Sequence, residues 1–362
     1  MKSASKFEQK PPFDASVIKG VYIILIVIGH NIFINRIPGD IFRFLYSFHV
    51  FGFFLLPFLF PSKVVSEKNI IKFLARYLVP YTIFFIILFL IYQYLYLSSV
   101  GHEIDALSLL IAFITGSALF LKDAVGFQFL WFLPSFFSLV VIRMIYTSQN
   151  GNKRFFFIIV SFLFHMLIGL VPKEILIYFP LGLAPALFVF LLGIMVENFL
   201  RIIFLNTRIS MIISFLVWVF FYFYAYRELP GINLGIMKVP DISKIKSLII
   251  YDGIIISSFV FIVSISSILS RCSWLTFIGK RSMNIYLLHS MVFYFLYFLL
   301  AKGASFMGNV YLNSYLTFLM TFIFTILITL KITLLLDRYD IIKRILFPKD
   351  ISDFFSIKTI SR

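Results

Sequence analysis

The chain of 362 residues is 61% hydrophobic and 20% aromatic, and only 13% of its residues are charged. A soluble domain has about a quarter charged residues, so the composition excludes an ordinary soluble protein. The net charge of +16 does not indicate a nucleic-acid partner, because the lysines and arginines lie mostly in short segments between apolar runs, as in membrane proteins. The composition therefore predicts a protein embedded in membrane lipid.

The apolar runs predict an all-α fold. Most are about 20 residues long, which is the length of a helix that crosses a bilayer, whereas the strands of a membrane barrel alternate over about ten residues. We expect a polytopic membrane helix bundle with about ten transmembrane helices, at approximately 16–35, 41–60, 70–97, 126–147, 154–171, 174–198, 206–227, 246–270, 281–301 and 311–336.

One further apolar segment, 105–121, is interpreted differently. It contains Gly116 and Ser117 and is flanked by Asp105 and Asp123. We expect an interfacial or re-entrant piece, and the alternative is an eleventh span. That alternative would invert every later loop and spoil the distribution of basic residues described next.

The basic residues predict the orientation. With the N-terminus in the cytoplasm, 22 of the 32 lysines and arginines fall on the cytoplasmic side, as the positive-inside rule requires. Lys2, Lys6 and Lys10 precede the first span like the start of an uncleaved signal anchor. We expect a multi-pass membrane protein with both termini in the cytoplasm, a membrane-embedded domain over 1–336 and a cytoplasmic tail over 337–362.

The number of cysteines limits which disulfides and metal sites the chain can form. Cys272 is the single cysteine, so no intramolecular disulfide can form and nothing suggests a metal cluster. We expect no metal site and no permanently bound cofactor.

The first span carries two ionisable residues at an informative spacing. Lys19 and His30 are eleven residues apart, which on a helix brings them to within about 20° of one face and separates them by about 16 Å along the axis. Ionisable groups in an apolar span are functional candidates by default. The plainer alternatives are that Lys19 snorkels to the interface and that His30 is a core histidine bonded to a neighbouring helix.

Depth estimates bring further polar residues near His30. His49 lies at a similar depth in the second span, and the connection between the two spans is short, so the two imidazoles could share a cavity. Trp131 and Gln128 enter the fourth span from the same side. The alternatives are that His49 is a core histidine and that Trp131 is an ordinary interfacial aromatic.

Two histidines lie in other spans. His289 stands in the ninth span with Asn284 below it, and it could equally be a core residue. His165 is alone in the fifth span, where a structural role is the simpler interpretation.

This pattern suits the transfer of a group from an extended, phosphorylated donor. A neutral imidazole can take a proton from a hydroxyl during nucleophilic attack. A cation about 16 Å away along the helix could hold the far end of the donor, and basic loops could hold its phosphates. Coenzyme A thioesters have this form.

Six motifs occur in a characteristic order. They are Asp14 with Lys19-Gly20 and Gly29-His30; Ser47-Phe48-His49 before Phe53-Phe54; Lys68 to Arg76 before Val79-Pro80-Tyr81; Leu130-Trp131-Phe132-Leu133; Phe190-Leu191-Leu192-Gly193; and Phe277 to Ser282 before Ile285-Tyr286-Leu287-Leu288-His289. Over roughly residues 13–300 the chain resembles the acyltransferase 3 family of integral-membrane acyltransferases, and most closely its fucose 4-O-acetylase-like branch. Val50-Phe51 departs from the Met-Pro usual after the second-span histidine.

The resemblance implies an O-acyltransferase of the bacterial cytoplasmic (inner) membrane. The donor would be acetyl-CoA or another short acyl-CoA, and the acceptor a hydroxyl of a cell-surface glycan or lipid-linked saccharide. His30 would be the catalytic base or a transient acyl carrier, and Lys19 would position the donor. Further candidates for the cavity are Asp14, which would orient Lys19, and Asn31, His49, Arg76, Trp131, Asn284 and His289.

Two other functions compete with this interpretation. A polysaccharide or glycolipid transporter or flippase predicts paired broken helices and internal symmetry, and the sequence shows no matched pair. A glycan polymerase predicts a large outer loop rich in Arg or Asp, whereas the loops here are modest. Cleavage of acetyl-CoA by washed membranes would distinguish the enzyme from both.

Overall fold

The computed structural model describes residues 13–31, 33–34, 41–94, 105–203, 207–225, 234–238, 245–306 and 314–350. Lys2, Lys6 and Lys10, the tail from 351 and the span ends expected at 35, 97, 206, 227 and 311 lie outside these ranges. The α-helices are α1 (Ala15–Gly29), α2 (Ile41–Tyr46), α3 (His49–Leu55), α4 (Glu67–Phe73), α5 (Val79–Tyr92), α7 (Ala106–Thr115), α8 (Ala118–Val125), α9 (Phe132–Ser148), α10 (Gly151–Leu167), α11 (Lys173–Leu176), α12 (Leu183–Ile203), α13 (Thr207–Ala225), α14 (Ile245–Leu269), α15 (Ser273–Lys280), α16 (Ser282–Phe306), α17 (Ser314–Leu336) and α18 (Asp340–Leu346).

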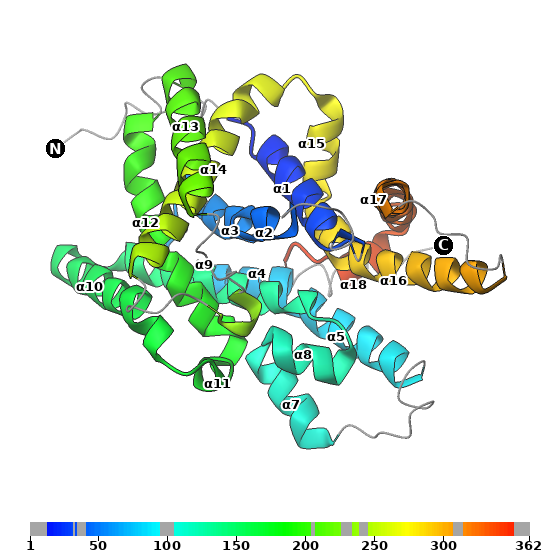
Figure 1. Ribbon diagram of the computed structural model, residues 1–362. Helices are drawn as coiled ribbons and strands as arrows, with labels where there is room; N and C mark the ends of the chain where they lie inside the picture. The colour runs from blue at the N-terminus through cyan, green and yellow to red at the C-terminus, as the bar shows by residue number, and fades with distance from the viewer. Residues whose placement is uncertain are drawn as a thin grey trace, which may run out of the picture.

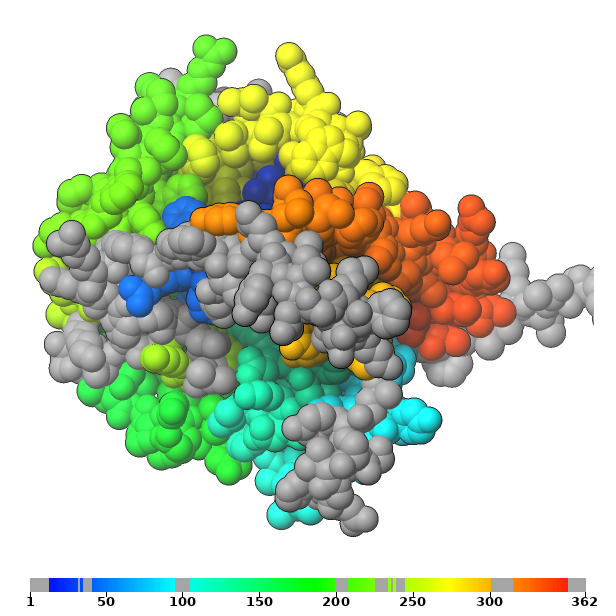
Figure 2. All heavy atoms as spheres, turned by 45° about the vertical axis from the view of Figure 1, so that its right-hand side comes forward, coloured from blue at the N-terminus to red at the C-terminus, as the bar shows by residue number. Residues whose placement is uncertain are grey.

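The described residues form a helical bundle without β-strands (Figure 1), which confirms the predicted fold class. Eight helical stretches are long and apolar enough to cross a membrane. They correspond to eight of the ten predicted spans, and the other two are the shorter apolar helices α1 and α13. Helices α10, α12 and α13 lie on one side of the molecule and α16 and α17 on the other (Figures 1 and 2).

Helix α1 is shorter than predicted. Asp14 caps its start, because the Ser16 N–H donates to the Asp14 carboxylate over 2.7 Å, and the helix ends at Gly29, with His30 as its C-cap. The cause lies in Asn31, whose side-chain oxygen accepts the Phe33 N–H (3.0 Å) and thereby offers the backbone an alternative to the helix. His30 is therefore at the end of a helix and not in the middle of one.

The second and third spans are irregular helices. The second breaks at Ser47-Phe48 between α2 and α3 and finishes as a 3₁₀ turn, Leu56–Leu59, which contains Pro57. In the third, a π-helical turn, Leu74–Leu78, joins α4 to α5. Pro80 explains this turn, since a proline cannot donate to the carbonyl four residues earlier. Such π-turns are frequent at functional sites, and this one carries Arg76.

The segment 105–121 is not a single span. Helices α7 and α8 divide it at Gly116, which ends α7 in the left-handed conformation with φ of +61°. This division argues against a continuous eleventh span, and the interfacial or re-entrant position stays a prediction. The sixth span begins later than the predicted residue 174, because the left-handed Leu181 and Gly182 after Pro180 separate α11 from α12.

Helix α1 lies in the interior of the bundle, in contact with α3, α14, α15, α16 and α17. Its closest contact is with α15. A Cβ atom at Gly279 would lie 1.7 Å from the carbonyl oxygen of Ser16, and one at Gly20 would lie 2.3 Å from that of Leu275. The two helices therefore touch backbone to backbone, which only glycine permits at these positions.

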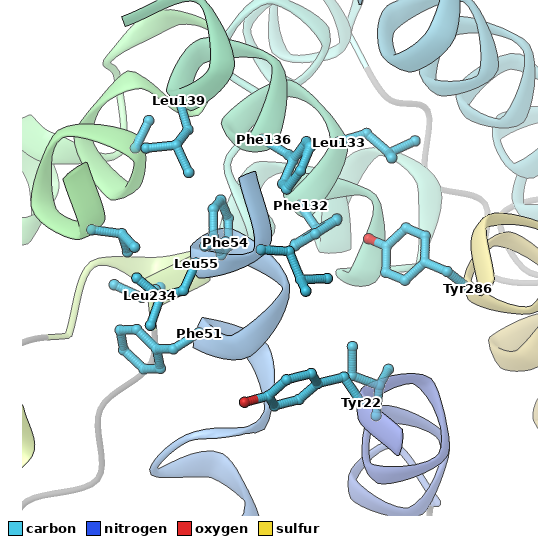
Figure 3. Close-up of a cluster of buried hydrophobic side chains, with 14 of the residues drawn as sticks. Tyr22, Phe51, Phe54, Leu55, Phe132, Leu133, Phe136, Leu139, Leu234 and Tyr286 are labelled. Carbon is cyan, nitrogen blue, oxygen red and sulfur yellow. The ribbon is translucent and has the colours of Figure 1, made fainter. Parts of the chain in front are cut away.

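A cluster of aromatic side chains packs beside α1 (Figure 3). Phe54 of α3 contacts Phe132 of α9 at 4.8 Å between ring centroids, and Phe132 contacts Tyr286 of α16 at 5.2 Å. Because these rings come from three helices, they hold α3, α9 and α16 around α1.

The glycine contact yields a prediction. The variants Gly279→Ala and Gly20→Ala should each lose about 2 kcal/mol or more of stability, since an added methyl group meets backbone that cannot rotate away. The thermal unfolding midpoint of purified protein in detergent measures this loss. Gly151→Ala is the matched control, because nothing lies within 4 Å of its Cβ position. Equal midpoints for Gly279→Ala and Gly151→Ala would contradict the contact.

Candidate active site

A cavity of about 390 Å³ lies at the Lys19 end of α1. Four cationic side chains line it, those of Lys19, Lys63, Arg76 and Arg143, and no carboxylate is among the described residues in its wall. We refer to it as the basic cavity. The residues that approach it come from α1, the segment after the 3₁₀ turn, the π-turn and α9, so the fold gathers cations that are far apart in the sequence.

Arg143 has a structural task in this wall. It is 4% exposed, and its guanidinium donates to the carbonyl oxygens of Pro57 (2.6 Å) and Phe60 (2.7 Å). It also pairs with the half-buried Glu197 (3.2 Å). Arg143 therefore satisfies carbonyls at the end of the broken second span and holds the Pro57–Lys63 side of the basic cavity in place.

A narrow neck of about 40 Å³ adjoins the basic cavity. The two share Ile26, Phe132 and Tyr286 as wall residues. His30 lines the neck on its other side, together with further aromatic and aliphatic residues: Tyr46, Val50, Phe51, Phe129, Trp131 and Leu234.

A third cavity, of about 270 Å³, lies beyond the neck and shares His30, Tyr46, Phe129 and Trp131 with it. We refer to it as the aromatic cavity. Its wall also contains Lys122, Gln128, Ser290 and Tyr294. Because α1 supplies Lys19 to the first cavity, Ile26 to the first two and His30 to the last two, the three spaces follow one another along this helix.

Hydrogen bonds fix the tautomer of His30. Its Nδ1 is 3.0 Å from the carbonyl oxygen of Ile26, which can only accept, so Nδ1 carries the hydrogen. His289 is similar, because its Nδ1 donates to the Tyr286 carbonyl (2.7 Å). The Nε2 of His289 then accepts from Ser290 (3.1 Å) and faces the His30 Nδ1 at 3.4 Å. His30 is left with an unprotonated Nε2, on a ring that lines the neck.

His49 lies behind His30, with 6.1 Å between the ring centroids. It is fully buried, and its Nε2 lies 3.1 Å from the Cβ position of Gly29. The structure thus brings the two imidazoles to one level, as the depth estimate predicts. Only His30 lines the cavities, however, and the expected sharing of one cavity is wrong.

Three predicted cavity residues lie elsewhere. Asp14 is the N-cap of α1, and the described residues show no ion pair between it and Lys19. Asn31 is 1% exposed and donates to the Phe318 carbonyl and the Thr321 hydroxyl of α17, both at 3.0 Å. Asn284 lies half-buried in the first turn of α16, outside the walls of the three cavities described above.

Asn31 nevertheless bears on the site. By tying the end of α1 to α17, it fixes the backbone of the neighbouring His30. His165, by contrast, is remote from the three cavities: it bonds Asp252 (3.0 Å) and the Phe188 carbonyl (2.9 Å), which agrees with a structural role.

Sequence reasoning missed several wall residues. Arg143 carried a usable signal, since an arginine inside an apolar span is itself a functional candidate. Tyr286 stood within a quoted motif. Leu234 comes from the long segment between α13 and α14 and is 3% exposed, and no sequence pattern indicated that it enters the core.

Comparison with known families identifies the class of protein to which this chain belongs. The family model for the acyltransferase domain of the acyltransferase 3 family matches residues 14–337, and the chain belongs to this family. The predicted family is confirmed, whereas the fucose 4-O-acetylase-like branch stays a prediction. No curated protein and no solved structure matches the chain. With its apolar helices, the protein is a membrane acyltransferase.

The position of Arg143 yields a prediction. Arg143→Met should lower stability by about 2 kcal/mol or more, because it removes charged hydrogen bonds to two carbonyls. The unfolding midpoint in detergent is the measurement. Arg338→Met is the matched control, since Arg338 is exposed. If both variants unfold at the wild-type midpoint, Arg143 does not hold the wall.

Proposed function

We propose that the protein transfers an acetyl or other short acyl group from acyl-CoA to a hydroxyl of a cell-surface or lipid-linked saccharide. One observation carries the proposal: a basic cavity, a neck lined by His30 and an aromatic cavity follow one another along α1. Each space suits one part of the reaction.

The basic cavity suits the phosphorylated end of coenzyme A. Lys19, Lys63 and Arg76 are the cations available there for phosphate oxygens, because the Arg143 guanidinium is occupied by carbonyls and Glu197. The aromatic rings between Lys19 and His30 suit the pantetheine arm, whose length is comparable to the rise of about 16 Å between the two residues.

The neck suits the chemical step. The acceptor hydroxyl oxygen attacks the thioester carbonyl carbon, so that a carbon–oxygen bond forms and the carbon–sulfur bond breaks. His30 Nε2 takes the hydroxyl proton as a general base and then gives it to the departing sulfur, which leaves as the free thiol of coenzyme A. The Nδ1–H bond to Ile26 holds the imidazole in the tautomer that this step needs.

The aromatic cavity suits a saccharide. Trp131, Phe129 and Tyr294 offer ring faces, and Gln128 and Ser290 offer hydrogen-bonding groups. A sugar ring presents apolar faces and polar edges, which such a wall complements. A hydroxyl of a sugar in this cavity would lie beside His30.

We place the Lys19 end at the cytoplasmic face of the bacterial inner membrane, with both termini inside, because acyl-CoA is cytoplasmic and the basic residues are concentrated on that side. The saccharide would then approach the neck from the aromatic cavity, on the side opposite the donor. A transporter or flippase is not favoured, since the chain belongs to an acyltransferase family.

The role of His30 is tested directly by substitution. His30→Ala should lower the cleavage of acetyl-CoA by washed membranes, measured as thiol release, by about a hundredfold or more. His165→Asn is the control, because His165 lines none of the three cavities. Rates are compared at equal amounts of folded protein. A His30→Ala variant with full turnover would remove the mechanism.

The role of Lys19 predicts a different kinetic change. Lys19→Ala should raise the KM for acetyl-CoA about tenfold and change kcat by less than about threefold, because Lys19 binds the donor and takes no part in the chemistry. Lys331→Ala, at an exposed position on α17, is the matched control. A lowered kcat with an unchanged KM would argue against donor binding.

A further inference from the structure

We infer that the neck limits the transferred acyl group to two carbons, and that Val50 and Leu234 are the side chains that set this limit. The inference rests on the proposed function, since it concerns the acyl-CoA site. It adds a rule of selectivity among donors and assigns that rule to two residues outside the chemistry.

The size of the neck supports this limit. Its volume is about 40 Å³, against about 390 Å³ and 270 Å³ for the cavities on its two sides, so the neck is the narrowest of the three spaces along α1. An acetyl group carries one methyl group on its carbonyl carbon and suits this narrow space. A propionyl or butyryl group adds methylenes, which would have to lie against the walls of the neck.

A longer acyl chain has no other direction to take. The space on one side is the basic cavity, where the pantetheine arm lies in the proposed complex. The space on the other side is the aromatic cavity, where the acceptor hydroxyl must approach His30. A chain that extended through the neck would therefore occupy the position of the acceptor.

The aromatic walls of the neck are braced and cannot widen easily. Trp131 stacks on Phe54 with ring centroids 5.8 Å apart, and Phe132 contacts Tyr286 at 5.2 Å. The Tyr286 hydroxyl donates to the Phe129 carbonyl. Since each ring is held by a neighbour from another segment, widening the neck would disturb several packed contacts together.

The aliphatic walls are Ile26, Val50 and Leu234. Ile26 also lines the basic cavity and supplies the carbonyl that orients His30, so its side chain is not specific to the neck. Val50 and Leu234 line the neck and neither of the other two cavities. Figure 3 shows Leu234 beside Phe51, at the side of the cluster away from Tyr286.

The segment that carries Leu234 is pressed against the site. A Cβ atom at Gly235 would lie 2.8 Å from the Cβ of Ala118 and 3.0 Å from Nε1 of Trp131. The backbone therefore packs directly on α8 and on Trp131, which keeps the buried Leu234 side chain in the wall.

The test compares acetyl-, propionyl- and butyryl-CoA in washed membranes from cells that produce the full chain. Thiol release is measured, with membranes from cells that do not produce the chain as background. For the wild type, kcat/KM should fall about tenfold or more for each added methylene. In Val50→Ala and Leu234→Ala, the ratio of butyryl to acetyl kcat/KM should rise about tenfold, because each truncation opens space beside the acyl group.

Val263→Ala and Leu248→Ala are the matched controls. Both residues are buried in α14 and line none of the three cavities. Val263→Ala removes the same atoms as Val50→Ala, and Leu248→Ala removes the same atoms as Leu234→Ala. Their butyryl-to-acetyl ratio should equal that of the wild type. A general loosening of the protein would raise the ratio in the controls as well and would overturn the assignment.

The remaining outcomes separate the two proposals. Wild-type protein that uses butyryl-CoA as well as acetyl-CoA would overturn the length limit and leave the acyltransferase function intact. A wild-type ratio in both Val50→Ala and Leu234→Ala would overturn the assignment of these residues. Membranes that cleave none of the three thioesters above background would overturn the proposed donor itself.

Discussion

The backbone contact between Gly20 of α1 and Gly279 of α15 is the constraint on which the site depends. It lets two helices that are far apart in the sequence approach more closely than any side chain would allow. The contact fixes the N-terminal part of α1, and with it Lys19 in the wall of the basic cavity. Asn31 fixes the other end through α17. Helix α1 is thus held at both ends, and the residues between them line the path from donor to acceptor.

Around this helix the fold separates binding from chemistry. Cations are gathered at one end and aromatic rings at the other, while the histidines meet between them, where His289 and His30 are 3.4 Å apart. The orientation of His30 is set entirely by neighbours, through the Ile26 carbonyl and the His289 ring. A base held in this way is preorganised, so that little rearrangement is needed when the hydroxyl arrives.

Local sequence patterns predicted the helices and the spacing of Lys19 and His30, because apolar length and helical periodicity are properties of one segment. They did not predict that α1 ends at Gly29, since this depends on Asn31 and the distant α17. The burial of His49 behind His30 and the role of Arg143 as a partner for carbonyls also arise from tertiary packing. Leu234 shows most clearly what local patterns cannot predict, because it enters the core from a segment without hydrophobic periodicity.

The central claim is that one path along α1 holds the donor and brings its acyl carbon to His30. The most direct measurement is a structure of the protein with a non-hydrolysable acetyl-CoA analogue. The account predicts phosphates beside Lys19 and Arg76 and the pantetheine arm against Phe132 and Tyr286. The acyl carbon should lie about 4 Å from His30 Nε2, so that an acceptor hydroxyl can bridge the carbon and the nitrogen. An analogue bound with its acyl group in the basic cavity or outside the helix bundle, remote from His30, would contradict it.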